Sequence, residues 1–112
     1  MKLVKAYFKA FKLRDVTIAL HHIDGLSGAS ISKVAGFGRG KDATSTGFSP
    51  GDSPSQFDTH IKLEVVCSDD LVQQVIAAVH RAAHTGLRGD GKIYVSNVEQ
   101  EIRIQDDPET AP

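Results

Sequence analysis

The sequence has few of the residues that mark a specialised environment. Its 112 residues include one cysteine, one methionine and no tryptophan. Cys67 cannot form an internal disulfide, and its place in the apolar run Leu63–Cys67 favours a small buried side chain over a reactive thiol. No apolar run reaches the roughly 20 residues that span a bilayer, and the N-terminus lacks a signal-peptide pattern. We therefore expect a cytoplasmic protein that does not insert into membranes.

An excess of charge is also absent. Lys and Arg total 13, Asp and Glu total 14, and the formal net charge at pH 7 is -1. This balance excludes broad binding of nucleic acid or membrane surfaces through bulk positive charge, so any anion site must be local. The hydrophobic fraction of 40% is ordinary for a globular domain. A chain this short buries a modest core, which self-association would extend.

The apolar periodicities predict the order β-α-β-β-α-β. Residues 2–9 alternate as a half-buried strand does, and further strands are predicted at 29–35, 61–67 and 92–95. Helical spacing is found in residues 13–23 and again from residue 69 onward. This order is typical of the ferredoxin-like fold, an α+β class in which both helices cover one face of a four-stranded antiparallel sheet. We expect one domain over residues 1–105, in which 101–105 can add a short strand, and a polar tail over 106–112.

The second helix has predicted start and stop signals. Ser68 is placed to cap it, and Asp69 and Asp70 fall in its first turn, where the helix dipole favours negative charge. Gly86 is placed to end it. Its predicted buried residues are Leu71, Val72, Val75, Ile76, Val79 and Ala82.

Residues 42–59 form a long polar segment between the second and third predicted strands, rich in Ser, Thr, Gly, Pro and Asp. A loop of this length inside a compact domain is usually either functional or disordered. Because the flanking strands belong to the same predicted sheet, we interpret the segment as a working loop and not as a linker between domains.

Two segments combine glycine with positive charge, and a third candidate position is an arginine. Thr85–Lys92 resembles a phosphate-binding P-loop, but Ile93 stands where that motif needs Ser or Thr to hold magnesium, and the segment leads from helix to strand instead of strand to helix. Its glycines still allow close approach of an anion to the backbone, and Arg88 and Lys92 supply charge. The second segment is Gly36–Lys41, and the third position is Arg103 near the C-terminus.

The whole chain resembles the PII signal-transduction proteins. The resemblance is carried by the opening MKLVKAYFKAFKL of residues 1–13, by VAGFGR of residues 34–39, by TGLRGDGKIYV of residues 85–95 and by IRI of residues 102–104. It implies a ferredoxin-like homotrimer that binds ATP or ADP in clefts between subunits. It also implies that a long T-loop, about residues 40–59 here, reports energy or metabolite status to a regulated partner, which we expect to be a membrane transporter.

The resemblance also implies a nucleotide site, position by position. Gly89, Gly91, Lys92 and Arg103 match phosphate-binding residues, and Arg39 matches an arginine that reaches the phosphates from the neighbouring subunit. Arg88 and Asp90 of the same glycine-rich segment are included in the predicted site. The positions around ribose and adenine match Gly28, Ser30, Gly36, Gly38 and Val66.

Three positions depart from the family pattern. Gly40 replaces the glutamine that faces magnesium and 2-oxoglutarate, His60 replaces the lysine that pairs with the carboxylate of 2-oxoglutarate, and Gln105 replaces a second phosphate arginine. A lost charge-assisted contact costs about 1.5–3 kcal/mol, so we expect weak 2-oxoglutarate binding and a preference for ADP or AMP over ATP, with magnesium left open. Gly40, Lys41 and His60 are candidates to hold a small anion such as bicarbonate as a co-ligand.

Two other function classes remain as alternatives. A metal-handling trimer like the CutA proteins would share the architecture, and His80 and His84 are spaced i, i+4 on the second helix, but the sequence offers no third ligand, so no metal site is predicted. A ferredoxin-like enzyme would need an acid-base or nucleophile pair on matched elements, and none is found. We therefore predict a regulator and not an enzyme.

Overall fold

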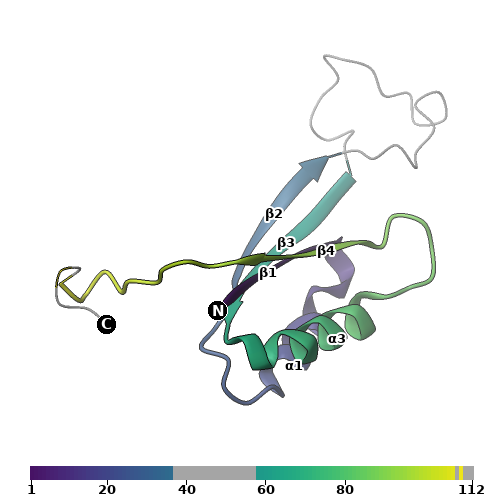
Figure 1. Cartoon of the computed structure of the whole chain (residues 1–112). Coiled ribbons are helices and arrows are strands. Elements are labelled where there is room, and N and C mark those ends of the chain that lie inside the picture. Colours follow the sequence, from purple (N-terminus) through teal and green to yellow (C-terminus); the bar gives the residue numbers. More distant parts are fainter. Residues whose placement is uncertain (37–57, 108, 110–112) are drawn as a thin grey trace.

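A computed structural model describes residues 1–36, 58–107 and 109. The elements follow one another as β1 (Lys2–Lys9), α1 (Leu13–His21), β2 (Ser30–Gly36), β3 (Asp58–Cys67), α3 (Val72–Ala83) and β4 (Gly91–Asn97) (Figure 1). A short 3-10 turn precedes each helix, η1 (Ala10–Lys12) and η3 (Asp69–Leu71). The predicted β-α-β-β-α-β order is confirmed.

The four strands form one antiparallel sheet in the order β2-β3-β1-β4. Both helices lie on the same side of this sheet (Figure 1), as expected for an α+β ferredoxin-like fold. β1 is paired on both sides by strands that come much later in the chain, β3 and β4. The end of β1 is therefore the place where the starts of β3 and β4 meet.

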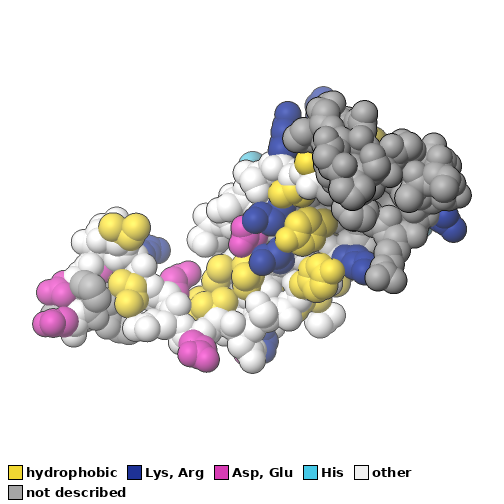
Figure 2. All heavy atoms as spheres, turned by 90° about the horizontal axis from the view of Figure 1, so that it is seen from above, with side chains coloured by type: hydrophobic (Ala, Val, Ile, Leu, Met, Phe, Trp, Pro, Cys, Tyr) yellow, Lys and Arg dark blue, Asp and Glu magenta, His cyan; other side chains and the backbone are white. Residues whose placement is uncertain are grey.

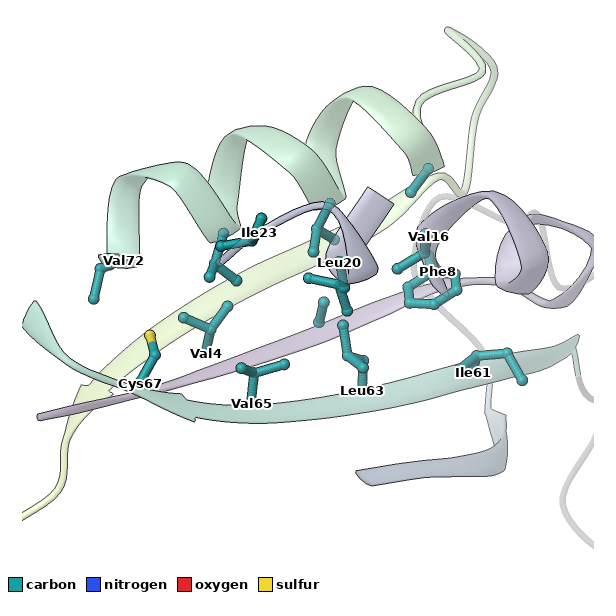
Figure 3. Packing of buried hydrophobic residues seen from close by; sticks show 14 residues of the cluster. Val4, Phe8, Val16, Leu20, Ile23, Ile61, Leu63, Val65, Cys67 and Val72 are labelled. Carbon is teal, nitrogen blue, oxygen red and sulfur yellow. The ribbon is translucent and has the colours of Figure 1, made fainter. Parts of the chain in front are cut away.

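The core lies between the sheet and the helices (Figure 3). The alternation predicted for residues 2–9 is confirmed, since Val4, Ala6 and Phe8 are at most 1% exposed. Burial of such side chains contributes roughly 25 cal/mol for each Å² of apolar surface. The remaining buried members are Val16, Leu20, Ile23, Ile61, Leu63, Val65, Cys67, Val72, Val75, Val79 and Ala83.

The second helix differs from its prediction at both ends. Ser68 stands at the N-cap position of η3, but its side chain makes no capping hydrogen bond. The carboxylate of Asp69 instead accepts a hydrogen bond from the Met1 ammonium at 2.6 Å. The helix ends at Ala83, followed by an extended His84, so Gly86 lies in the loop and does not end the helix. The physical cause is tertiary, since the chain turns here to reach the start of β4.

The C-terminal segment also differs from its prediction. β4 continues to Asn97, but residues 101–105 form no strand in the described chain. A strand needs a partner, and this segment runs away from the sheet (Figure 1), with Ile104 fully exposed. Among the described residues, no helix combines the length and apolar character needed to cross a bilayer.

The face of the sheet opposite the helices is uncovered in the single chain. Seen from above, hydrophobic side chains are interspersed there with Lys or Arg and with acidic side chains (Figure 2). The rings of Tyr7 and Tyr94 pack edge to face on neighbouring strands, with centroids 6.2 Å apart. Lys62 and Glu64 form an ion pair at 3.7 Å. This face is neither purely polar nor an apolar core.

Candidate functional site

The candidate site lies at the end of the sheet where β1 finishes. Lys9, the last residue of β1, is paired with His60 of β3, and Phe8 is paired with Gly91 of β4. Residues 84–90 connect α3 to β4 at the same end. The glycine-rich segment predicted to bind phosphate therefore lies beside the last residue of β1 and the first residues of β3.

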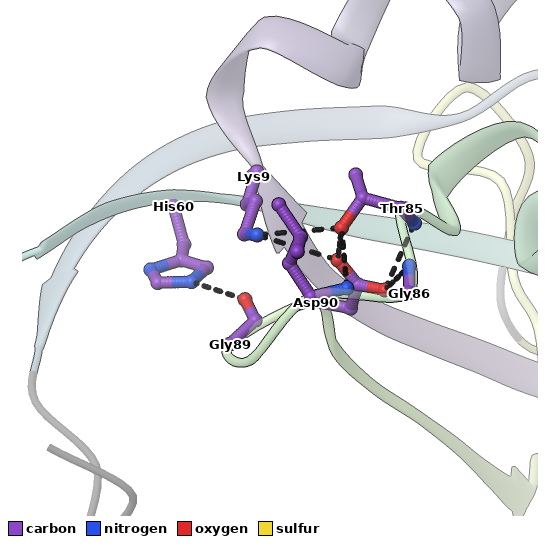
Figure 4. A network of polar contacts seen from close by, with 7 residues as sticks. Lys9, His60, Thr85, Gly86, Gly89 and Asp90 are labelled. Atoms are coloured by element: carbon purple, nitrogen blue, oxygen red, sulfur yellow. Dashed lines mark hydrogen bonds and ion pairs between the residues drawn. The ribbon is translucent and has the colours of Figure 1, made fainter.

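The carboxylate of Asp90 is the centre of a hydrogen-bond network in this loop (Figure 4). The backbone N–H groups of Thr85 and Gly86 both donate to Asp90 Oδ2, each at 2.9 Å. The Thr85 hydroxyl donates to Asp90 Oδ1 and accepts from the N–H of Leu87 at 3.1 Å. The loop is thus closed by hydrogen bonds between its own side chains and backbone.

Lys9 contributes the positive charge of the same network. Its ammonium lies 3.4 Å from Asp90 Oδ1 and donates to Thr85 Oγ1, also at 3.4 Å. The side chains of Lys9 and Asp90 are 22% and 24% exposed, so water screens the pair only in part. Hydrogen bonds from the Thr85 hydroxyl and backbone, joined by those from Gly86 and Lys9, hold the pKa of Asp90 well below its ordinary value. Asp90 is therefore charged at neutral pH.

Three glycines of the loop, Gly86, Gly89 and Gly91, have a positive φ, and the last two show why glycine is needed. Gly89 has a φ of +81°, which side-chain-bearing residues rarely adopt. Gly91 has a φ of +117°, and a Cβ at this position would lie 1.7 Å from the carbonyl oxygen of Tyr7. Gly91 thus allows the backbone of β4 to approach β1 closely.

His60 of β3 also contacts this loop. Its Nε2 lies 3.4 Å from the carbonyl oxygen of Gly89 (Figure 4), and the side chain is half-buried. β3 begins at Asp58, directly after residues 37–57. His60 therefore connects β3, the strand that follows the predicted T-loop, to the predicted phosphate loop.

The other predicted site residues lie in several parts of the fold, and some are far from this loop in the same chain. Val66 is paired with Leu3, six residues along β1 from Lys9, which is about 20 Å at about 3.3 Å per residue. Ser30 begins β2 opposite Glu64, Gly28 precedes it, and Gly36 ends β2. Arg103 lies in the exposed segment after β4. Arg88, Gly89, Asp90, Gly91, Lys92 and His60 are together at one end of the sheet, whereas Gly28, Ser30, Val66 and Arg103 are not with them.

Part of the prediction falls outside the described residues. Gly38, Arg39, Gly40 and Lys41 lie there, as does the predicted T-loop up to residue 57. The end of the predicted polar tail, residue 108 and residues 110–112, lies there too.

Lys9 and Thr85 were missed by the sequence reasoning. Lys9 occupies a solvent-side position in the alternation of β1, where a lysine is unremarkable. Only the pairing of β1 with both β3 and β4 brings its ammonium to Asp90. A signal for Thr85 was available, because a Thr and an Asp that flank a glycine-rich turn often close it through their side chains.

Metal-ligating side chains are sparse in the described parts of the chain. No group of three or more His, Cys, Asp or Glu that could hold a metal ion is found there. The imidazoles of His80 and His84 are exposed and stacked, with ring centroids 5.4 Å apart. Cys67 is a buried free thiol whose pKa is raised by burial, which agrees with the predicted structural role.

Comparison with known proteins gives a consistent relationship. The family profile described as Nitrogen regulatory protein P-II matches residues 1–108. A Nitrogen regulatory protein P-II of Haemophilus influenzae is 46% identical over 105 residues, covering 94% of this chain and 92% of the relative. Proteins of the same name from Bradyrhizobium diazoefficiens and Azospirillum brasilense are 43% and 42% identical over the same shares.

Proposed function

The chain belongs to the P-II family of nitrogen regulatory proteins, and from this premise we propose that it binds an adenine nucleotide and regulates a partner protein. Nucleotide would bind in clefts between the subunits of a cytoplasmic homotrimer, and the T-loop, about residues 40–59, would carry the signal. P-II proteins are signalling regulators, and the proposed role requires no catalytic step. The domain responsible is proposed to be residues 1–105, followed by a polar tail.

One observation carries this proposal, the preformed loop of residues 85–92. Its shape is held by Asp90 and Thr85 from within, and Arg88 and Lys92 are exposed on it. A glycine-containing loop that is held by internal hydrogen bonds and carries two cations suits a phosphate group, because backbone N–H groups and positive charge both favour an anion. The residues proposed to form the phosphate end of the site are Arg88, Gly89, Asp90, Gly91, Lys92 and Arg103.

The division of the site within one chain supports assembly. A cyclic oligomer uses a heterologous interface, in which one end of a subunit meets the other end of its neighbour. Such contact would bring the loop of one subunit toward residues of the next, including the proposed adenine and ribose positions Gly28, Ser30, Gly36, Gly38 and Val66. Arg39 would reach the phosphates from the neighbouring subunit. The uncovered sheet face, with Tyr7 and Tyr94, supports the same conclusion.

The proposed ligand preference follows from three replaced residues. Gln105 in place of a phosphate arginine weakens the hold on a third phosphate, so ADP or AMP is proposed to bind better than ATP, with or without magnesium. Gly40 and His60 remove two contacts to 2-oxoglutarate. Together with Lys41 they leave room for a smaller anion, for which bicarbonate is the proposed co-ligand.

Signalling is proposed to act through the conformation of the T-loop. A nucleotide that contacts the base of the loop would favour one of its conformations, and the shift is limited by the difference in affinity between them. The His60 contact with Gly89 supports such coupling, because it joins β3 to the phosphate loop. The regulated partner is proposed to be a membrane transporter, by the family resemblance.

Isothermal calorimetry with AMP, ADP, ATP and 2-oxoglutarate tests the proposal. We expect saturable binding of ADP or AMP, weaker binding of ATP, and a loss of about tenfold or more in ADP affinity in Arg88→Ala and Lys92→Met. Arg81→Ala, which removes an exposed cation from α3, is the matched control. Absence of binding by every adenine nucleotide at millimolar concentration would refute the proposal.

Light scattering tests the proposed homotrimer. The measured mass should be three times the mass of one chain.

A second candidate is a metal-handling trimer like the CutA proteins, favoured by the stacked His80 and His84. Two imidazoles at i, i+4 can chelate Cu²⁺ or Zn²⁺, and other ligand positions would be filled by water. Saturable binding of either ion that is lost in a His80→Ala, His84→Ala double variant, but kept in a His21→Ala, His22→Ala variant, would support it.

A further inference from the structure

We propose that Asp90 acts as a built-in anion of the loop, with Lys9 as its counter-ion, and that the pair sets the part of the loop open to phosphate. Asp90 and Lys9 are then positioning residues and not ligands of the nucleotide. The proposal rests on the proposed nucleotide site and deepens it, since it assigns roles within residues 85–92 that the family resemblance does not distinguish.

The first step concerns the backbone donors of the loop. Three consecutive N–H groups, those of Thr85, Gly86 and Leu87, donate to side chains of the loop itself. Two of them converge on one oxygen of Asp90, in the way that backbone donors converge on a bound anion. The N–H groups of residues 85–87 are therefore already hydrogen-bonded, which leaves the segment from Arg88 to Lys92 for a phosphate.

The second step concerns charge. A carboxylate this close to a phosphate site would repel the ligand unless its charge were balanced. The Lys9 ammonium lies 3.4 Å from Asp90 Oδ1, and both side chains are largely shielded from water. Lys9 thus balances the charge of Asp90 at Oδ1, the oxygen that also accepts from the Thr85 hydroxyl. Because Lys9 is the last residue of β1, this ion pair also connects the loop to the sheet.

The two roles predict different effects of substitution. Asp90→Ala removes the acceptor of both backbone donors, so the loop loses its shape, and we expect ADP affinity to fall about tenfold or more. Asp90→Asn keeps one amide oxygen as an acceptor and should retain more affinity than Asp90→Ala. Lys9→Met leaves the carboxylate unbalanced and should weaken ADP binding about fivefold to tenfold, an effect that added salt reduces.

Lys12→Met is the matched control for Lys9→Met. Lys12 also forms an ion pair with an aspartate, Asp15, at 3.7 Å, but on η1 and α1. We expect the ADP affinity of Lys12→Met, and the salt dependence of that affinity, to equal those of the wild type.

Thermal unfolding checks that the wild type, Asp90→Ala and Lys9→Met are all folded. Equal ADP affinity in these three folded proteins would overturn the proposal.

Two measurements without nucleotide separate this proposal from the proposed function. Hydrogen exchange by NMR should show the amides of Thr85 and Gly86 protected in the wild type and unprotected in Asp90→Ala. Carboxylate titration by NMR should show the pKa of Asp90 rising more in Thr85→Val than in Lys9→Met, because the Thr85 hydroxyl is the larger cause of its low value. If these results hold while no nucleotide binds, the proposed nucleotide binding is refuted and the role of Asp90 in shaping the loop is kept. If the amides of Thr85 and Gly86 exchange freely in the wild type, the role proposed for Asp90 is refuted.

Discussion

The Nε2 atom of His60 lies 3.4 Å from the carbonyl oxygen of Gly89, so β3 and the loop that leads into β4 are in direct contact. The two residues are 29 positions apart in the chain. β3 follows residues 37–57, and Gly89 belongs to the proposed phosphate loop. The contact thus joins the strand that follows residues 37–57 to the proposed phosphate loop.

The His60 position gives a prediction about 2-oxoglutarate. The resemblance to the family implies a lysine at this position, whose full charge would lie beside the ligand carboxylate, and a Gly40→Gln change would supply the second implied contact. We expect the double variant His60→Lys, Gly40→Gln to bind 2-oxoglutarate at least about tenfold more tightly than the wild type, in calorimetry with ATP and magnesium. His60→Gln with Gly40→Gln, which adds no charge at position 60, is the control. Unchanged affinity in the double variant would show that these two residues do not set the preference.

Gly91 gives a prediction about stability. A Cβ in Gly91→Ala would overlap the Tyr7 carbonyl oxygen, so β4 must move away from β1. We expect a loss of about 3 kcal/mol or more in the free energy of unfolding, measured by urea denaturation. Gly28→Ala is the comparison, because Gly28 also has a positive φ but a Cβ there meets nothing within 4 Å. It should lose about 1–2 kcal/mol, and equal losses in the two variants would argue against the close approach of β4 and β1.

Asp69 gives a prediction about acid. The hydrogen bond from the Met1 ammonium, with the charge of that ammonium, lowers the pKa of Asp69 below its ordinary 3.8. A lowered pKa in the folded state means that the interaction stabilises the protein above the ordinary pKa and is lost as pH falls through the lower, folded-state value. The stability advantage of the wild type over Asp69→Asn should thus be constant from pH 5 to pH 6 and shrink below about pH 4.

Urea denaturation at a series of pH values measures this difference in protein with a free Met1 amine. Asp70→Asn removes a neighbouring exposed carboxylate and controls for net charge. N-terminal acetylation should abolish the advantage at every pH, because it removes the ammonium. An advantage that survives acetylation would contradict the assigned cause.

Tyr94 gives a prediction about assembly. It is 52% exposed on the uncovered face of the sheet and packs against Tyr7. If this face is buried between subunits, Tyr94→Glu places an unpaired charge there and should shift the trimer toward monomer at low micromolar concentration. Light scattering coupled to size exclusion measures the mass. Ile18→Glu, at an exposed position of α1, is the control and should leave the mass unchanged.

Much of the fold could be predicted from local patterns. The alternation that buries Val4 and Phe8 and the helical spacing of Val75 and Val79 are properties of short segments, and each period has one physical meaning. The ends of the second helix could not be predicted in this way. Ser68 has the right residue type for a cap, but Asp69 is engaged by the distant N-terminus, and the helix stops before Gly86 because the chain must reach β4.

The order of strands and helices, the family and the residue types of the proposed phosphate loop follow from the amino-acid sequence, because these depend on neighbours along the chain. That Lys9 balances Asp90 and that His60 meets Gly89 follows from the folded chain alone. Both contacts arise because β1 pairs with β3 on one side and β4 on the other. Long-range pairing of this kind brings together residues whose roles cannot be read from their local surroundings.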